Sequence, residues 1–137
     1  MVKRKVSLRI EEKICEKLDI QLVYLFGSYV RGDKNFQDID IAILINLESP
    51  DIIKEMEIAE SFKNELTKNH PNLPIQVTPL NSANPLLRYE VIKEGRAIYA
   101  SSNEERIAFE MKTLREYGDY KAKSRFYEMA LKNRLKE

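Results

Sequence analysis

The sequence predicts one α+β domain that ends in a helical tail. Three observations predict it: helical and strand spacings of apolar residues alternate along the chain, four short apolar runs have the composition of strands, and the last third keeps only helical spacing. With 137 residues, 43% hydrophobic and 33% charged, the chain can bury a single core and is not of the disordered class. We expect the main part of the domain at residues 1–100 and the tail at residues 101–137.

The first half of the chain alternates helices with strands. A first helix is expected behind Ser7, a residue type that caps helices, and should run to about Asp19. Residues 21–26 (QLVYLF) and 38–45 (DIDIAILI) predict the first two strands. A second helix should begin at Ser49-Pro50-Asp51, with an acid near its positive dipole end. Its expected buried stripe is Ile52, Met56, Ala59, Phe62 and Leu66.

The second half predicts two more strands and two more helical segments. Residues 75–80 predict a strand whose Pro79 either stops its pairing or places it at a sheet edge. Residues 85–94 predict a helix that Gly95 closes as its C-terminal cap, and residues 96–100 predict the fourth strand.

The tail from about Ser102 predicts helix, bent or broken at Gly118. Tyrosines near basic residues in the tail could stack on bases, but packing in a core or against a partner fits a helix better. They are Tyr117, Tyr120 and Tyr127.

Composition excludes several classes of protein. The formal net charge is +1, so no overall field draws the chain to nucleic acid or to a membrane. No apolar run approaches the ~20 residues that cross a bilayer, and no signal-type segment follows the basic start, so we expect a cytoplasmic protein. Cys15 is alone, which excludes an internal disulfide and a cysteine-rich zinc site, and its helical context predicts a small buried residue.

The stretch "FGSYVRGDKNFQDIDIAIL", residues 26–44, holds the candidate site. Gly27 ends a strand and permits a sharp turn, where free N–H groups and the Ser28 hydroxyl can bind phosphate. Arg31 follows one helical turn later and can point to the same place. A Gly-Ser pair by itself is most often only a turn, so this signal needs the residues that follow it.

Two aspartates open the second predicted strand. Asp38 and Asp40 project from the same face, because side chains alternate along a strand. An isolated Asp-x-Asp is usually a solvated acid pair. Beside a phosphate pocket, however, the two carboxylates are suited to Mg²⁺, which proteins hold with few carboxylates and with phosphate oxygens. Order and spacing together therefore predict a metal-nucleotide site.

These residues also carry a family resemblance. "GSYVRGDKNFQDIDIAIL" resembles the signature of the nucleotidyltransferase superfamily that includes DNA polymerase beta, and "PLLRYEVIKEGRAIYA" and "FEMKTLREYGDY" resemble its minimal members, which are often encoded beside a HEPN-domain protein. Val30 stands where that signature commonly has alanine. The similarity covers nearly the whole chain, but only the Gly-Ser and Asp-x-Asp element is specific.

The resemblance implies a mixed sheet of about four strands flanked by helices, and transfer of AMP from ATP to a tyrosine of a HEPN ribonuclease toxin, for which the chain would be the antitoxin. It implies that Gly27, Ser28 and Arg31 bind the nucleotide and that Asp38 and Asp40 are catalytic and bind Mg²⁺, in a site for two metal ions. A complex with the toxin, or self-association, is also expected, without direct binding of nucleic acid.

One residue departs from the family pattern. Family members commonly carry a third carboxylate on the strand after the long helix, and the corresponding position here is Gln76. An amide is a weak Mg²⁺ ligand and cannot act as a general base. Glu90 and Glu94 lie on the next predicted helix, but nothing in the sequence shows that either replaces it.

Other classes of function remain as alternatives. The missing carboxylate leaves open weak activity, an engineered inactive variant, or an antitoxin that acts by binding alone. An antibiotic nucleotidyltransferase would need a further helical domain around its small acceptor or a dimer, and a nucleic-acid-binding regulator would need a basic face.

Overall fold

A four-stranded mixed sheet forms the centre of the described part of the chain. The computed structural model describes residues 8–32 and 38–135, apart from the side chain of Ser28. The strands are β1 (Ile20–Phe26), β2 (Ile39–Ile45), β3 (Ile75–Pro79) and β4 (Arg96–Ala100), in the order β3-β2-β1-β4. β1 runs antiparallel to β2 and to β4, whereas β2 and β3 are parallel. The predicted α+β fold with a mixed sheet is confirmed, and Pro79 ends an edge strand as expected.

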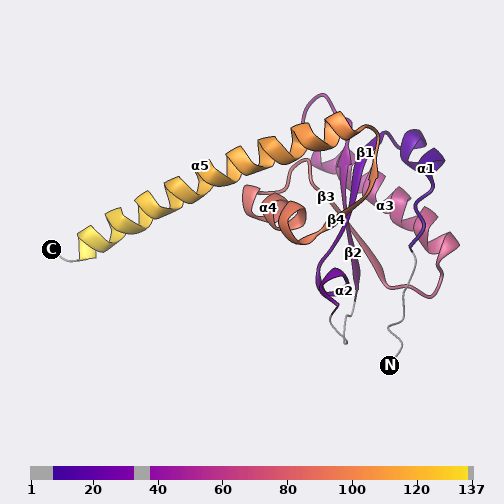
Figure 1. The fold of residues 1–137 in the computed structure, drawn as a ribbon, viewed down its shortest axis with the longest axis horizontal. Helices are drawn as coiled ribbons and strands as arrows, with labels where there is room; N and C mark the ends of the chain where they lie inside the picture. Colours follow the sequence, from indigo (N-terminus) through magenta and orange to yellow (C-terminus); the bar gives the residue numbers. More distant parts are fainter. Residues whose placement is uncertain (1–7, 33–37, 136–137) are drawn as a thin grey trace.

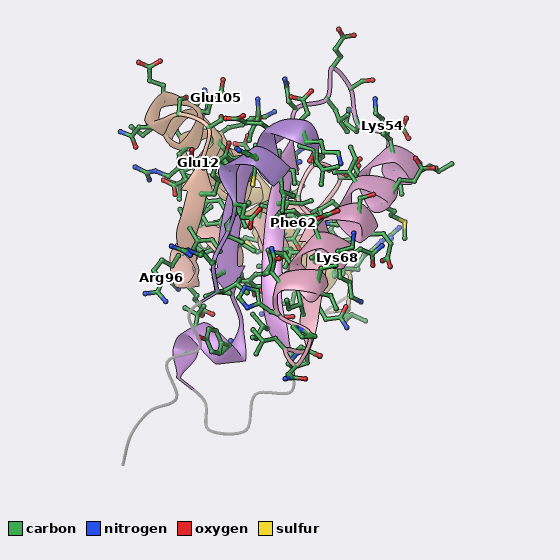
Figure 2. All side chains as sticks on the ribbon, turned by 90° about the vertical axis from the view of Figure 1, so that its right-hand side faces the viewer. Glu12, Lys54, Phe62, Lys68, Arg96 and Glu105 are labelled. Carbon is green, nitrogen blue, oxygen red and sulfur yellow. The ribbon has the colours of Figure 1, made fainter. Side chains whose placement is uncertain are left out.

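Helices cover both faces of this sheet (Figure 1). α1 (Glu12–Lys17) and α3 (Ile52–Asn69) lie on one face, and α4 (Pro85–Glu94) and α5 (Asn103–Leu135) lie on the other. The short α2 (Ser28–Arg31) follows β1 at one end of the sheet, the end at which β4 begins with Arg96 (Figure 2). Among the helices that the structure describes, none is long and apolar enough to span a bilayer.

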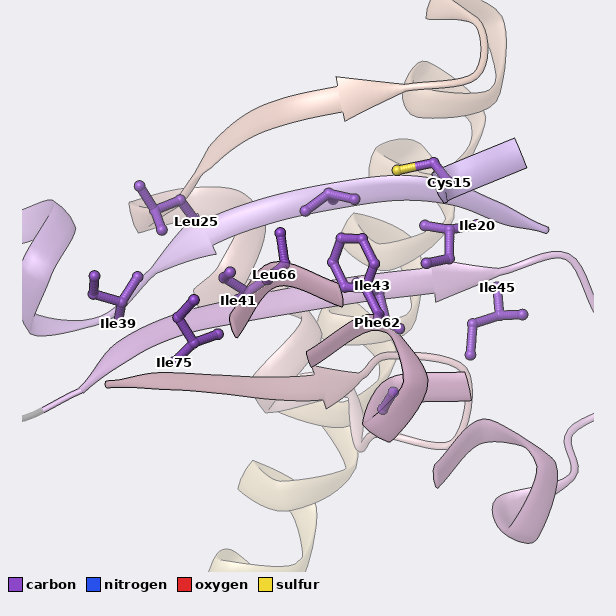
Figure 3. Packing of buried hydrophobic residues seen from close by; sticks show 12 residues of the cluster. Cys15, Ile20, Leu25, Ile39, Ile41, Ile43, Ile45, Phe62, Leu66 and Ile75 are labelled. Carbon is purple, nitrogen blue, oxygen red and sulfur yellow. The ribbon is translucent and has the colours of Figure 1, made fainter. Parts of the chain in front are cut away.

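The larger core lies between the sheet and α3. Every second residue of β2 from Ile39 to Ile45 is buried there, and Phe62 and Leu66 of α3 pack against this row (Figure 3). Cys15 joins the same core, as predicted, and burial together with the nearby Glu12 and Glu16 raises the pKa of its thiol to about 12. A thiol with so high a pKa stays protonated and unreactive at neutral pH.

The opposite face of the sheet carries a smaller core. Leu22 and Tyr24 of β1 pack there with Val91 of α4 and Phe109 of α5. The Tyr24 hydroxyl donates a hydrogen bond of 2.9 Å to a Glu110 carboxylate oxygen. Alternation along β1 and β2 therefore separates two cores, and Asp40 belongs to the face that α4 and α5 cover.

The first helix is shorter than predicted. It begins after Glu11, whose backbone is extended, and it ends at Lys17, so Ile10 precedes the helix although it packs against the core. Ser7, the predicted cap, lies outside the described residues. Asp19 adopts a positive φ of 59°, which turns the chain directly into β1 and leaves no room for a longer helix.

The prediction of the buried stripe of α3 was wrong at two positions, Ile52 and Met56. Ile52 and Met56 are exposed, whereas Glu55 is buried. The Glu55 carboxylate accepts hydrogen bonds from the Asp51 N–H (3.0 Å), the Ser82 N–H (2.9 Å) and the Ser82 hydroxyl (2.6 Å). These three donors compensate the cost of burying the Glu55 carboxylate. In the first turns of α3 the side chain that faces inward is therefore a carboxylate and not an apolar group.

Two glycines act differently from the prediction. Gly95 ends α4, but its φ of −84° and ψ of 175° are extended, not the left-handed geometry of a glycine cap. A Cβ at Gly95 would overlap the Val91 carbonyl oxygen and lie 3.0 Å from the Leu25 carbonyl oxygen, so this glycine permits close packing of α4 on β1. Gly118 does not break α5, which continues as one helix for 33 residues.

Candidate nucleotide and metal site

The turn after β1 brings a glycine against an aspartate from the next strand. Phe26, the last residue of β1, pairs with Asp40 of β2, so Gly27 lies directly beside that carboxylate. Gly27 has a φ of 84°, and a Cβ on it would overlap the Asp40 Oδ2 atom and lie 3.2 Å from its Cγ atom. Glycine is favoured here for two reasons: the backbone is left-handed, and any Cβ would force the Asp40 carboxylate to shift.

Asp38 and Asp40 lie close enough for their negative charges to repel each other. The pKa of Asp40 is raised above its ordinary value, first because burial disfavours the charged form, and next because the negative charge of Asp38 lies nearby. The positive charge of Arg31 acts in the opposite direction and lowers this pKa. Two partly buried carboxylates that repel each other favour a bound cation, because a cation removes the repulsion.

Gln76 lies beside Asp40 on the neighbouring strand. The parallel register of β2 and β3 pairs Asp40 with Gln76 and Ala42 with Thr78. Ile75 and Val77 contribute to the core on the α3 side, so Gln76 points to the same face as Asp40 and is exposed there. The position at which the family resemblance implies a third carboxylate is therefore adjacent to the aspartate pair, and an amide occupies it.

Arg31 has a partner that the sequence did not reveal. Its guanidinium Nη1 lies 3.5 Å from the Glu94 Oε2 atom, at the C-terminal end of α4, and both side chains are about half exposed. Because β4 pairs antiparallel with β1, the end of α4 that precedes β4 must lie where β1 ends, close to Gly27. A sequence pattern could have located Glu94 only if that strand pairing had been known.

The structure thus gathers five of the six predicted site residues at one end of the sheet: Gly27, Arg31, Asp38, Asp40 and Gln76. Ser28 begins α2 at the same place, but its side chain is outside the description. Within residues 8–32 and 38–135, no group of three or more His, Cys, Asp or Glu side chains is placed to share a metal ion. The donor set is two carboxylates, which suits Mg²⁺ only if phosphate oxygens complete its coordination.

Comparison with known proteins identifies similar sequences. The family described as polymerase beta, nucleotidyltransferase matches residues 9–104, more than half of the chain. The protein adenylyltransferase MntA of Shewanella oneidensis is 30% identical over 99 residues, which are 72% of this chain and 66% of that protein. The match thus spans slightly less than two thirds of that relative.

Solved structures share the fold. One, a toxin-antitoxin with AMP-PNP, contains a chain that is 26% identical, with a TM-score of 0.64 over 89% of this chain and 98% of that one. Another, the tri-AMPylated HEPN toxin of Shewanella oneidensis in complex with MNT antitoxin, gives 25% identity and a TM-score of 0.62 over 88% and 91% of the two chains. With its family match, its mixed sheet and its Gly-Ser and Asp-x-Asp residues at one end of that sheet, the chain belongs to the polymerase beta nucleotidyltransferase family.

Proposed function

We propose that this chain is a minimal nucleotidyltransferase that transfers AMP from ATP to a tyrosine hydroxyl of a HEPN-domain toxin, in the cytoplasm, and so acts as its antitoxin. One observation carries the proposal: the Asp40 carboxylate lies against the left-handed turn at Gly27, and the charge of Asp38 acts on that same carboxylate. The relatives named as a protein adenylyltransferase and as an antitoxin bound to a HEPN toxin support the choice of acceptor.

Each residue has a defined part in this proposal. Asp38 and Asp40 would hold Mg²⁺, and the N–H groups that follow Gly27, with the Ser28 hydroxyl, would bind the phosphates of ATP. Arg31 would turn from Glu94 toward the triphosphate, because a phosphate group carries more negative charge than a half-exposed carboxylate. When bound, Mg²⁺ supplies neutralisation of the phosphate charge and orients the α-phosphate.

The proposed reaction is an in-line substitution at phosphorus. The tyrosine oxygen forms a bond to the α-phosphorus, the bond from the α-phosphorus to the oxygen of the β-phosphate breaks, and pyrophosphate leaves with the electron pair. The phenolic proton must be released, and the amide of Gln76 cannot accept it. We therefore propose that the native enzyme is slow, because the position beside Asp40 offers no base.

We propose that the chain is one domain with two parts. Residues 1–100 form the nucleotidyltransferase part, and residues 101–137 form its helical tail. The family match over residues 9–104 supports this division, because it ends within the first turn of α5.

A binding-only antitoxin is the second candidate. The specific observation in its favour is again Gln76, together with the lack of a three-carboxylate group among the residues that the structure describes. Such a protein would neutralise the toxin as a stable complex, and ATP would be irrelevant to its action.

Two measurements test the proposal. Calorimetry should detect ATP binding that requires Mg²⁺, and Asp40→Asn should weaken it at least tenfold. Labelled ATP should then transfer its α-phosphate to the HEPN partner. Binding that is equal in the variant and the parent would reject the metal site, whereas Mg²⁺-dependent binding without any transfer would favour the binding-only antitoxin.

A further inference from the structure

We propose that the distal half of α5, residues 118–135, is a docking arm that inserts into an acidic groove of the partner protein. The inference rests on the proposed function for the identity of that partner, a HEPN-domain protein. It adds which segment of this chain makes the contact and what kind of surface receives it. Figure 1 shows this half of the helix extending away from the sheet.

The proximal half of α5 is firmly attached to the domain. Besides the Tyr24 to Glu110 hydrogen bond, Arg88 of α4 forms an ion pair of 3.1 Å with Glu116. The rings of Tyr89 and Tyr117 stack in parallel, with their centroids 3.7 Å apart. These contacts end at residue 117, and every described residue from Gly118 to Leu135 is exposed.

The arm is nevertheless apolar along the face that the domain would cover. Phe109 and Thr113, the two buried residues of α5, define the face that packs on the domain. Steps of seven, seven and four residues from Thr113 lead to Tyr120, Tyr127 and Leu131, so these side chains continue the same face beyond the domain. Tyr127 is 70% exposed. The apolar stripe of α5 thus extends beyond the part of the domain on which it packs.

Large apolar side chains also occupy other sides of the arm. Phe126 is 75% exposed and Met129 is 64% exposed, and both lie away from the stripe of Tyr120 and Tyr127. Large apolar side chains on more than one side of a helix are covered better by a groove than by a flat surface. The receiving surface is therefore a groove.

Charge decides between a different protein and a second copy of this chain. Residues 119–135 contain five basic side chains and two acidic ones. Two such arms side by side would repel each other, whereas an acidic groove would attract the arm and orient it. The basic residues are Lys121, Lys123, Arg125, Lys132 and Arg134. The basic residues beside the apolar stripe thus favour an acidic partner over a second copy of this chain.

The test uses the full chain and the HEPN-domain protein that the proposed function names as its partner. The affinity of the two proteins is measured by calorimetry for the parent and for the double variant Tyr127→Asp with Leu131→Asp. Met111→Asp is the matched control, because Met111 is 60% exposed on the same helix but lies outside the arm. We expect a loss of at least 100-fold for the double variant and less than threefold for the control.

Further readings separate the possible outcomes. Lys121→Glu with Lys123→Glu should weaken the complex at least tenfold, and added salt should weaken the parent complex in the same direction. Because the arm is exposed, Mg²⁺-dependent ATP binding should be unchanged in every variant, which shows that the domain is folded. A complex that forms without AMP transfer would defeat the proposed function and leave the arm intact.

Three results would overturn the docking arm. They are full affinity in the double variant, no complex between the parent proteins at micromolar concentration, and a dimer of this chain that the double variant abolishes in light scattering.

Discussion

Replacing Gln76 by aspartate would complete the set of carboxylates at the proposed metal site. Gln76 is exposed, points to the same face as Asp40 and is its paired residue on the adjacent parallel strand. Neighbouring strands lie about 4.8 Å apart, so the new carboxylate would stand roughly 5 Å from that of Asp40. No backbone change is required, because both residues are compatible with an edge strand.

The substitution should lower the stability of the metal-free protein and raise the rate of AMP transfer when Mg²⁺ and ATP are bound. Two charges at roughly 5 Å repel by about 0.8 kcal/mol in water and by about 3 kcal/mol at an effective dielectric constant of 20. Because Gln76 is exposed, the lower figure applies, and metal-free Gln76→Asp should lose about 1 kcal/mol of unfolding free energy, or about 3 °C in Tm. With Mg²⁺ and ATP, the same group can anchor a second ion or accept the phenolic proton, and AMP transfer should rise at least ~10-fold, equivalent to ~1.4 kcal/mol in the barrier.

The assay is transfer of labelled AMP to the HEPN protein at saturating Mg²⁺, with the affinity for ATP measured separately and expected to change little. Thr78→Asp is the control: it adds the same charge on the same strand and face, but about 7 Å farther along, opposite Ala42. A rate in Gln76→Asp that is no higher than in the parent would refute the assignment of Gln76, or show that another acid already fills the role. Equal acceleration by Thr78→Asp would mean that any added negative charge on this face raises the rate, whatever its position.

Three further predictions concern individual side chains. Gly27→Ala should cost ~2 kcal/mol in urea unfolding and Gly32→Ala only ~1 kcal/mol, because both have positive φ but only the first would also force the Asp40 carboxylate to shift; equal costs would contradict the close approach. Since the folded state raises the pKa of Asp40 above 3.8, metal-free protein should lose stability as the pH rises from that value through the raised pKa, and Asp40→Asn should remove this slope; an unchanged slope would assign it to another group. Glu55→Ala should lower the unfolding free energy by about 3 kcal/mol without changing Mg²⁺-dependent ATP affinity, and a loss below ~1 kcal/mol would mean that its three hydrogen bonds contribute little.

The strands and the aspartate pair could be predicted because their signals are local. The isoleucines of β2 alternate with Asp40, so one short segment revealed both the core face and the site face. Pro79 could be placed at an edge for an equally local reason, its missing N–H. In each case the decisive chemistry lies within a few residues of sequence.

Features that depend on tertiary neighbours could not be predicted. Glu55 looks like a surface acid until the Ser82 N–H and hydroxyl, 27 residues later, are placed beside it. Gly95 resembles a helix cap, whereas its constraint is the space taken by two carbonyl oxygens, that of Val91 in α4 and that of Leu25 in β1. Gly118 was expected to interrupt the helix from propensity alone, but one exposed glycine costs only about 1 kcal/mol in a helix that is anchored at one end.

The length of α5 makes the position of its tip depend strongly on the orientation of its root. From Tyr117 to Leu135 the helix rises about 27 Å, at about 1.5 Å per residue, so a tilt of about 10° at its root moves its tip by roughly 5 Å. The root is held by Arg88 and Tyr89 of α4, and the last residue of that same short helix, Glu94, forms an ion pair with Arg31 at the proposed nucleotide site. A change in the orientation of α5 would therefore act first on α4, the ten-residue helix that also contacts the proposed site.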